Sequence, residues 1–222
     1  MILLVSRKKI GYNTHINHPT QPSRPDPRSQ IPDPMTYAEM FTEIAQKYGL
    51  DWRLLAEQAW AESRLDPLAV GKANDMGLFQ IIPSTWDEWA PRIGVVDPFD
   101  PYSNGLVAAA YLAFLRDYVG RFGLRDDYWV LLAYNWGPGN VRRLMESGGG
   151  WLDVPASRRE YANAIVLQAD AHALVQAQPD GLTAPVREMN LTGDSHDYLD
   201  DLLASPIPIT PTTPLSVRRR AT

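Results

Sequence analysis

The chain has 222 residues and a formal net charge of −5, and it contains no cysteine. This length is enough for one domain of about 150 residues with tails. The acidic balance excludes a general attraction to nucleic acid or to an anionic membrane surface, and the lack of cysteine excludes disulfides, thiolate metal sites and a cysteine nucleophile. No run approaches the ~20 apolar residues of a membrane-spanning helix.

Residues 1–34 are predicted to form an extended arm outside any packed core. Six prolines fall within sixteen of these residues, and proline at this density removes backbone donors and favours extended conformations. Residues 179–222 are also proline-rich and finish near three arginines, with one short helix expected at 195–204. The prediction is a compact domain at 35–178 between two arms. The opening MILLVSRKKI has the reverse order of a secretory signal and too short an apolar run, so no export signal is visible.

The helical pattern begins at Thr36, which forms a T-x-x-E capping box with Glu39. An apolar stripe follows as far as Gly49, so the first helix is predicted at 36–48. A second helical run, LDWRLLAEQAWAES, follows at once. It is predicted to stop by Asp66, because the next residue is proline, which disfavours the helical conformation in the residue before it.

Glu62 lies in or near the last turn of this second helix. Leu55, Ala59 and Glu62 fall at i, i+4 and i+7, which places the carboxylate on the apolar face. Burial and the negative end of the helix dipole both penalise the ionised form, so the pKa is expected to rise from about 4.3 toward neutrality. At such a pKa Glu62 can act as a general acid. The alternative is a structural glutamate satisfied by Arg64 or by a backbone amide.

Further helices are predicted after an irregular stretch rich in glycine and proline. They are a short helix at 84–89 capped by Ser84; a helix opened by Asn104 and closed at Gly120 or Gly123, with Leu106, Ala110, Leu115 and Val119 facing the core; YWVLLAYNW, capped by Asp126 or Asp127; VRRLMES, after the break GPGN; and REYANAIVLQADAHALVQA, with Tyr161, Ile165, Leu167 and Leu174 as its apolar members. No alternating pattern longer than four residues indicates a strand. The predicted fold class is therefore all-α.

Three separated motifs bear on Glu62. The first is the ES that it forms with Ser63. The second is GLFQIIPSTW from Gly77, where glycine allows close backbone approach and Gln80 places an amide among apolar residues. The third is AYNWGPGNV from Ala133, which places a phenol and a carboxamide before a glycine-proline break. In this order and spacing the motifs resemble the soluble lytic transglycosylase family, whose lysozyme-like domain carries an ES, a G-L-x-Q-[IL]-x-P-S-T and an A-Y-N-x-G-P-G motif.

The resemblance covers about residues 36–170 and includes DPFDPYSNGLVAAAYL, which is similar to the family's D-P-x-x-N-x-x-x-G-x-x-Y-L. It implies an all-helical lysozyme-like domain that cleaves the β-1,4 bond between N-acetylmuramic acid and N-acetylglucosamine in peptidoglycan. Glu62 matches the family's catalytic acid, and Ser63 matches a residue that positions that acid or the substrate. The resemblance assigns to the substrate cleft Gln80, Tyr134, Asn135 and, through a fourth and softer motif, Tyr161.

The sequence departs from the family's motifs at three places. It reads PASRREY where the family usually has E-T-R before the tyrosine. It has Met76 where a small residue is usual and Trp136 where alanine is usual. These changes leave the reaction in place and bear on the shape of the subsites. Tyr134 and Trp136 are interpreted as residues that stack on sugar rings, and the alternative for both is a core aromatic.

The implied reaction needs one enzyme carboxylate. A neutral Glu62 protonates the leaving oxygen, and the resulting carboxylate removes the proton from the C6 hydroxyl, which closes a 1,6-anhydro ring without water. Ordinary glycosidases use two carboxylates, and Asp75 or Glu88 would supply the second in a lysozyme-like hydrolase. Asp75 is expected to be a solvated loop residue instead. A further alternative is an inactive structural virion subunit with a glycan-binding groove.

No cofactor and no metal is expected, since His15 and His18 lack acidic or cysteine partners at ligand spacing. The expected partner is the peptidoglycan glycan strand, with neither nucleic acid nor a membrane-spanning segment involved. Since no export signal is visible, a bacteriophage virion or a secretion apparatus is the expected carrier to the periplasm or cell wall. The two arms are expected to bind the other subunits of that carrier.

Overall fold

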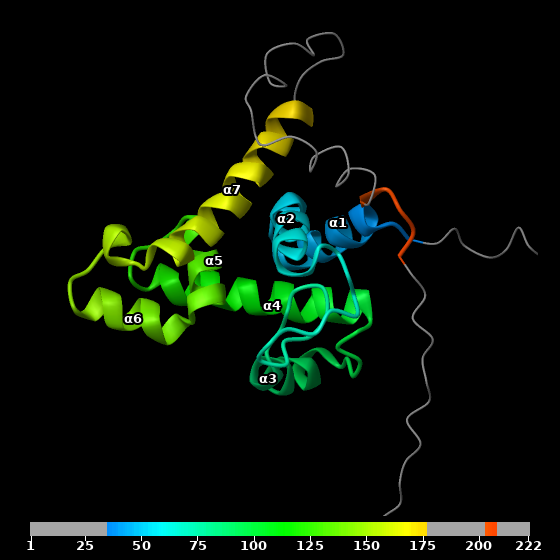
Figure 1. The fold of residues 1–222 in the computed structure, drawn as a ribbon, viewed down its shortest axis with the longest axis horizontal. Coiled ribbons are helices and arrows are strands. Elements are labelled where there is room, and N and C mark those ends of the chain that lie inside the picture. The colour runs from blue at the N-terminus through cyan, green and yellow to red at the C-terminus, as the bar shows by residue number, and fades with distance from the viewer. Residues whose placement is uncertain (1–34, 177–202, 208–222) are drawn as a thin grey trace, which may run out of the picture. The chain divides into compact units, whose positions relative to one another are not determined.

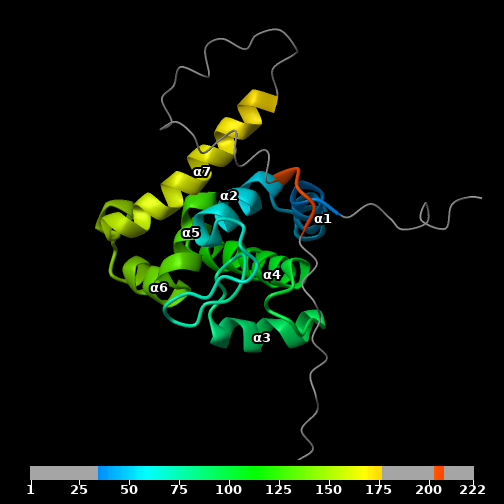
Figure 2. The same cartoon turned by 45° about the vertical axis from the view of Figure 1, so that its right-hand side comes forward.

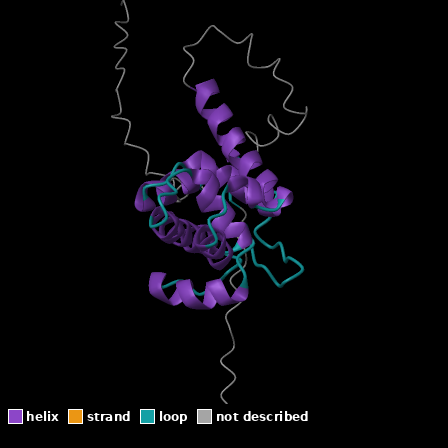
Figure 3. Cartoon of the chain, turned by 90° about the vertical axis from the view of Figure 1, so that its left-hand side faces the viewer, coloured by secondary structure: helices purple, strands orange, loops and turns teal. Residues whose placement is uncertain are grey.

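The computed structural model describes residues 35–176 and 203–207 (Figure 1). The helices are α1 (Tyr37–Tyr48), α2 (Trp52–Ser63), α3 (Pro83–Ile93), α4 (Pro101–Gly120), α5 (Asp127–Trp136), α6 (Pro138–Glu146), the 3-10 helix η2 (Trp151–Asp153) and α7 (Ala156–Gln176). The described ranges contain isolated bridges but no strand (Figure 3). The all-α fold class predicted from the sequence is confirmed.

The capping box predicted at the start of α1 is present. The Glu39 N–H donates to Thr36 Oγ1 at 3.2 Å, and the Thr36 N–H donates to the Glu39 carboxylate at 2.8 Å. Gly49 ends the helix in the left-handed conformation, with φ of 63°. The predicted helix at 36–48 is therefore confirmed, with Thr36 itself as the cap.

A short segment from the far end of the chain lies against the start of α1. The Ile207 N–H donates to the Met35 carbonyl at 3.0 Å, and Leu203 is buried in the core. Most of the helix predicted at 195–204 lies outside the described residues. The arm at 1–34 also lies outside them, so the three-part division of the chain stays a prediction.

The second helix, α2, begins after Asp51, whose carboxylate accepts the Arg53 N–H at 2.8 Å. It ends at Ser63, before the predicted limit, because Arg64 and Leu65 both adopt the left-handed conformation with φ of 59°. This conformation costs a non-glycine residue about 1 kcal/mol or more. The chain therefore turns sharply directly after Glu62.

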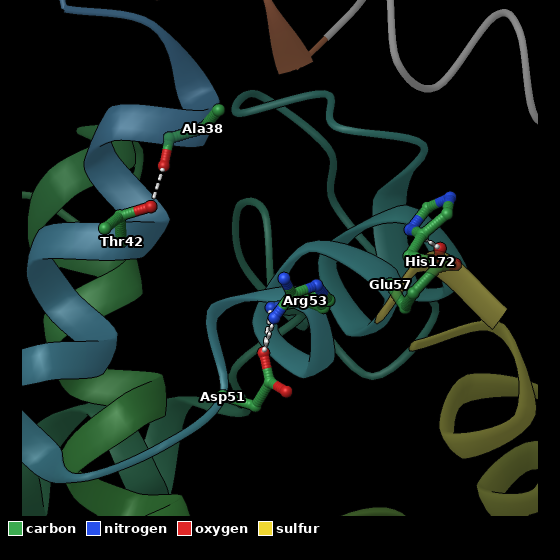
Figure 4. Close-up of polar contacts among 6 residues, drawn as sticks. All are labelled: Ala38, Thr42, Asp51, Arg53, Glu57 and His172. Atoms are coloured by element: carbon green, nitrogen blue, oxygen red, sulfur yellow. Dashed lines mark hydrogen bonds and ion pairs between the residues drawn. The ribbon is translucent and has the colours of Figure 1, made fainter. Parts of the chain in front are cut away.

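Helix α7 packs against α2 and α5, and its C-terminal end extends past them (Figures 1 and 2). A buried contact joins α7 to α2: His172 Nδ1 lies 3.1 Å from a carboxylate oxygen of Glu57 (Figure 4). Of the apolar residues named for this helix from the sequence, Leu167 and Leu174 are exposed. The buried stripe of α7 has i, i+3, i+4, i+7 spacing and consists of Ala162, Ile165, Val166 and Ala169, which leaves Leu167 on another face.

The third helix is longer than the predicted helix at 84–89. It begins at Pro83, with Ile82 and not Ser84 as the capping residue. Proline is favourable at this first helical position because its missing N–H would have no partner there. The helix continues through Pro91, which lies in its last turn on the exposed side, so the lost helical hydrogen bond costs little.

The fourth helix, α4, is opened by Asp100 and not by Asn104 as predicted. The Asp100 carboxylate accepts the Ser103 N–H at 2.8 Å. Asn104 lies in the first turn and is fully buried, where it binds the loops on both sides of α3. Its Oδ1 accepts the Phe79 N–H at 3.0 Å, and its Nδ2 donates to the carbonyls of Met76, before α3, and Pro98, after it, at 3.0 and 2.8 Å. The four α4 residues predicted to face the core are all buried.

The fifth helix begins after Asp126, one of the two caps predicted from the sequence, and its carboxylate accepts the Trp129 N–H at 3.2 Å. It ends at Gly137, and α6 starts at the next residue, Pro138. Helix α4 runs beneath these elements and contacts α1, α3, α5 and α6. A long helix with neighbours on several sides is apolar around most of its circumference, which explains why α4 is mostly buried.

Replacing Asn104 by alanine should destabilise the domain by about 2–4 kcal/mol, because one buried and two partly buried backbone groups lose their partner. Urea unfolding followed by circular dichroism measures the change. Asn163→Ala, a matched change at a partly exposed position of α7, should stay within about 0.5 kcal/mol of the wild type. Equal stability of Asn104→Ala and the wild type would contradict the role assigned to Asn104.

Candidate active site

Glu62 lies in the last turn of α2, and its partner comes from α7. The Tyr161 hydroxyl donates to Glu62 Oε1 at 2.6 Å. The carboxyl group is partly buried. Arg64, the structural partner considered from the sequence, lies instead over the ring of Trp60, with its guanidinium carbon 4.8 Å from the ring centroid. The partner of Glu62 is therefore a neutral phenol and not a cation.

Burial raises the pKa of Glu62 from its ordinary value of 4.5 to about 7. The hydrogen bond from Tyr161 acts in the opposite direction and lowers this pKa, while the charge of Asp75 raises it further. The group therefore carries a proton in a large fraction of molecules at neutral pH. Because Oε1 accepts the Tyr161 hydrogen bond, the proton of the neutral form belongs on Oε2.

Tyr134 links the third motif to the second. Its hydroxyl donates to the Phe79 carbonyl at 2.8 Å. Burial and the nearby charge of Glu62 raise the pKa of the Tyr134 phenol well above its ordinary value, so the hydroxyl stays protonated. The ring lies 5.7 Å from that of Tyr111, centroid to centroid. Tyr134 thus packs as an aromatic and also holds the backbone of the GLFQ loop near Glu62.

Ser63 and Gln80 stabilise the loop between α2 and α3. Ser63 Oγ lies 2.8 Å from the Leu78 carbonyl oxygen and 3.1 Å from that of Ala59. Gln80 Nε2 donates to the carbonyls of Gly77 at 2.8 Å and Ala69 at 3.2 Å. Ser63 therefore holds the loop against the end of α2, while Gln80 ties two parts of the loop together and keeps only Oε1 for other contacts.

Backbone strain is concentrated in this part of the chain. Non-glycine residues with positive φ in the described ranges are Arg64, Leu65, Asn74 and Gln80, and all lie between α2 and α3. Gly77 has φ of 71°, and a Cβ there would meet the Pro98 carbonyl oxygen at 2.5 Å. Strain of this kind persists where surrounding contacts hold it and is typical of functional sites.

Asp75 departs from the expectation of a solvated loop residue. It lies on the loop, as expected, but it is only partly exposed. Its side chain packs against Gly71, where an added Cβ would also meet Gln80 Oε1 at 2.6 Å. Glycine at position 71 therefore makes room for both polar side chains, and this brings the charge of Asp75 within electrostatic range of Glu62.

Asn135 is oriented by a residue that the sequence did not identify. Its Oδ1 accepts a hydrogen bond from Arg158 Nη1 at 2.6 Å, and Arg158 belongs to the PASRREY segment that departs from the family motif. Trp136 is partly buried and packs against the core, in line with the core-aromatic alternative. Among the described residues, the hydrogen bond to the Asn135 side chain comes from Arg158 and that to Glu62 from Tyr161.

Gln58 was also not identified from the sequence as a residue of the site. It lies four residues before Glu62 on α2 and is fully buried. The signal in the sequence was a polar side chain on the apolar face of the helix that carries Glu62.

The described residues include no cluster of three or more His, Cys, Asp or Glu side chains suited to a metal ion.

Comparison with known families decides the identity of this fold. The sequence model of the transglycosylase SLT domain matches residues 39–150. The chain belongs to the SLT transglycosylase family. The match contains the three motifs that surround Glu62, and the SLT domain therefore includes all the predicted site residues except Tyr161.

The sequence relatives are named membrane-bound lytic murein transglycosylase F. The protein of Thiobacillus denitrificans is 34% identical over 141 residues, which cover 57% of this chain and 29% of that protein. The protein of Maricaulis maris is 36% identical over 127 residues, which cover 53% and 27%. The SLT chain thus spans less than a third of the length of these relatives. Among its described residues no helix is long and apolar enough to cross a membrane.

Solved structures show the same fold. The 70 kDa soluble lytic transglycosylase SLT70 of Escherichia coli aligns with a TM-score of 0.54 at 24% identity, covering 63% of this chain and 24% of that one. The lytic transglycosylase Slt of Pseudomonas aeruginosa aligns with a TM-score of 0.51 at 21% identity and covers the same fractions. These alignments confirm the predicted all-α transglycosylase fold.

The raised pKa of Glu62 makes folding stability depend on pH. Between the ordinary value of 4.5 and about 7, the folded state binds more protons than the unfolded state, so stability falls as pH rises through this window. Glu62→Gln removes this loss. At pH 8 the variant should be more stable than the wild type by about 1–2 kcal/mol, after allowance for partial exposure, and the difference should vanish below pH 4.5.

Urea unfolding at pH 4, 6 and 8 measures this difference. Glu160→Gln, at an exposed position of α7 next to Tyr161, is the matched control and should follow the wild type at each pH. A constant difference between Glu62→Gln and the wild type across this range would contradict a raised pKa.

Proposed function

We propose that this protein is a peptidoglycan lytic transglycosylase that cleaves the β-1,4 bond between N-acetylmuramic acid and N-acetylglucosamine. The observation that carries the proposal is the environment of Glu62. Its Oε1 accepts the Tyr161 hydroxyl at 2.6 Å, and burial raises its pKa to about 7. A carboxyl group with this pKa can give up a proton and take one back near neutral pH.

The reaction proceeds in two proton transfers at the same carboxyl group. Protonated Glu62 gives its Oε2 proton to the glycosidic oxygen, and the bond from that oxygen to C1 of the muramoyl ring breaks. N-acetylglucosamine leaves with a free 4-hydroxyl, while the substrate's N-acetyl group assists at C1. The Glu62 carboxylate then removes the proton from the C6 hydroxyl, whose oxygen bonds to C1. The product is a 1,6-anhydro ring, no water is consumed, and Glu62 is protonated again.

The surrounding residues support this use of Glu62. Ser63 and Tyr134 hold the GLFQ loop next to the acid through the Leu78 and Phe79 carbonyls. We assign Gln80 Oε1 and the Asn135 side chain to substrate binding, because a hydrogen bond orients each amide: Gln80 Nε2 donates to the Gly77 carbonyl, and Arg158 donates to Asn135 Oδ1. Tyr161 is assigned to the acid itself. Its donation stabilises the carboxylate formed after the first transfer.

The relatives and structural neighbours support the same reaction. The sequence relatives are named as murein transglycosylases. One structural neighbour, from Pseudomonas aeruginosa, is described as an inactive mutant in which glutamine replaces a glutamate. In that protein the loss of one carboxyl group abolishes activity, which is the behaviour that the proposed mechanism requires of Glu62.

A hydrolase of the same bond is the second candidate. One observation favours it: Asp75 is partly buried on the loop beside Gly71 and within electrostatic range of Glu62. An inverting hydrolase would use such a second carboxylate to activate water, and a retaining one would use it as the nucleophile. The two reactions leave different ends on the muramoyl sugar, which makes them distinguishable.

Purified sacculi digested with the protein should release 1,6-anhydromuropeptides, detected by mass spectrometry. Glu62→Gln should lower the rate by about 10²–10⁴-fold, the range for loss of a general acid. Asp75→Asn should keep the anhydro product. If the wild type releases fragments with reducing ends in place of anhydro ends, and Asp75→Asn no longer releases them, the protein is a hydrolase. If the folded wild type leaves the sacculi intact, a structural subunit is favoured.

Glu160→Gln is the matched control for these digestions, because Glu160 is exposed on α7 beside Tyr161. It should retain wild-type activity. Circular dichroism of each variant separates loss of the proton donor from loss of the fold.

A narrower proposal concerns delivery. We infer from their proline and arginine content that the segments 1–34 and 179–222 attach the SLT domain to a carrier, either a phage virion or a secretion apparatus. Ten of the nineteen prolines of the chain lie in 1–34 and 206–214, and three consecutive arginines stand at 218–220.

A further inference from the structure

Gln58 lies one helical turn before Glu62, and the proposed reaction makes no use of it. Its side chain is 0% exposed, and neither amide atom has a hydrogen-bond partner among the described residues. Buried amides without partners are rare in folded proteins, and each one that occurs needs an explanation. A leucine or methionine would fill the same space without burying polar atoms.

The group beside the Gln58 amide is the Tyr161 hydroxyl. Gln58 and Glu62 occupy positions i and i+4 of α2, so their side chains leave the helix on one face, and α7 packs against α2. Tyr161 donates to Glu62 Oε1 at 2.6 Å. Burial and the charge of Glu62 raise the pKa of the Tyr161 phenol well above its ordinary value, and the Gln58 amide acts in the opposite direction. This is the effect of an N–H group directed at the phenol oxygen.

The Gln58 amide acts electrostatically on the Tyr161 phenol, but it makes no ordinary hydrogen bond with a described residue. Hydrogen bonds that serve catalysis are often long or poorly aligned in free enzymes and tighten in the substrate complex. The three polar groups therefore form a row from Gln58 through Tyr161 to Glu62. Only its last member, Glu62, is needed to transfer a proton.

We propose that Gln58 is a positioning residue, whose amide N–H donates to the Tyr161 oxygen and so holds the Tyr161 hydroxyl as a donor to Glu62. This inference rests on the proposed function of Glu62. A phenol oxygen can accept a hydrogen bond as well as donate one. With its oxygen occupied by Gln58, Tyr161 does not accept from Glu62, and the acidic proton stays on Oε2 for transfer to the substrate.

Gln58→Met keeps the length of the side chain and removes the amide. The melting temperature should equal or exceed that of the wild type, because the buried Gln58 Oε1, which has no hydrogen-bond partner among the described residues, is lost. The kcat on sacculi should fall by roughly threefold to tenfold with KM unchanged, which is a fraction of a general acid's contribution. The alkaline limb of the pH profile should move to higher pH, since Tyr161 then stabilises the Glu62 carboxylate less.

A merely structural Gln58 gives a different result: the melting temperature changes while the pH profile keeps its position. That outcome would overturn the proposal. Gln46→Met, the same substitution at an exposed position of α1, is the matched control and should leave kcat and the pH profile as in the wild type.

A double-mutant cycle with Tyr161→Phe tests whether Gln58 acts through Tyr161. In the phenylalanine background, Gln58→Met should cause no further loss of kcat, because the hydroxyl that it orients is gone. A second full loss would show that Gln58 acts by another route and would refute the proposal.

A readout without activity keeps this inference separate from the proposed function. Titration of the Glu62 carboxyl, followed by NMR on protein labelled with ¹³C at the glutamate carboxyls and assigned with Glu62→Gln, should give a higher midpoint in Gln58→Met than in the wild type. An unchanged midpoint would refute the role of Gln58 even if sacculi are cleaved. A raised midpoint with intact sacculi would support it while the transglycosylase proposal fails.

Discussion

The hydrogen bond between Tyr161 and Glu62 is the contact around which the site is arranged. It joins α7 to the end of α2 across 99 residues of sequence. Two opposing effects meet at this carboxyl group: burial raises its pKa, and the phenol lowers it. With both effects present the pKa is about 7, where the group can give up a proton and take one back. The packing of α7 on α2 therefore determines the chemistry.

The loop between α2 and α3 bears the backbone strain that this arrangement requires. Its left-handed residues lie at both ends of the stretch that carries Asp75 and the GLFQ motif. The contacts that hold it come from three sides: Ser63 from α2, Asn104 from α4 and Tyr134 from α5. Each of them binds backbone atoms of residues 76–79 or of the segment beside it. A strained loop held at its backbone can present side chains rigidly, as a catalytic site demands.

Membership of the SLT family and the local chemistry answer different questions. A fold shared with solved transglycosylases is compatible with several reactions, and the chain covers only part of its named relatives. The argument for the reaction comes from Glu62, from the Tyr161 phenol that donates to it, and from Gln58 beside that phenol. Gln58 and Arg158 are features of this chain's own site, and both orient a neighbouring side chain.

The sequence by itself determined the helices whose ends are set by local chemistry, and the motifs around Glu62. The Thr36 capping box, the Asp126 cap and the Glu62 position on an apolar helix face depend on neighbouring residues, so they were predictable. Tertiary structure decided the rest. Asn104 serves a distant loop, Leu167 is exposed because α7 meets its neighbours along another stripe, and Asp75 is sheltered by the space at Gly71. These outcomes depend on which surfaces pack together in the folded chain, and local sequence patterns do not determine that packing.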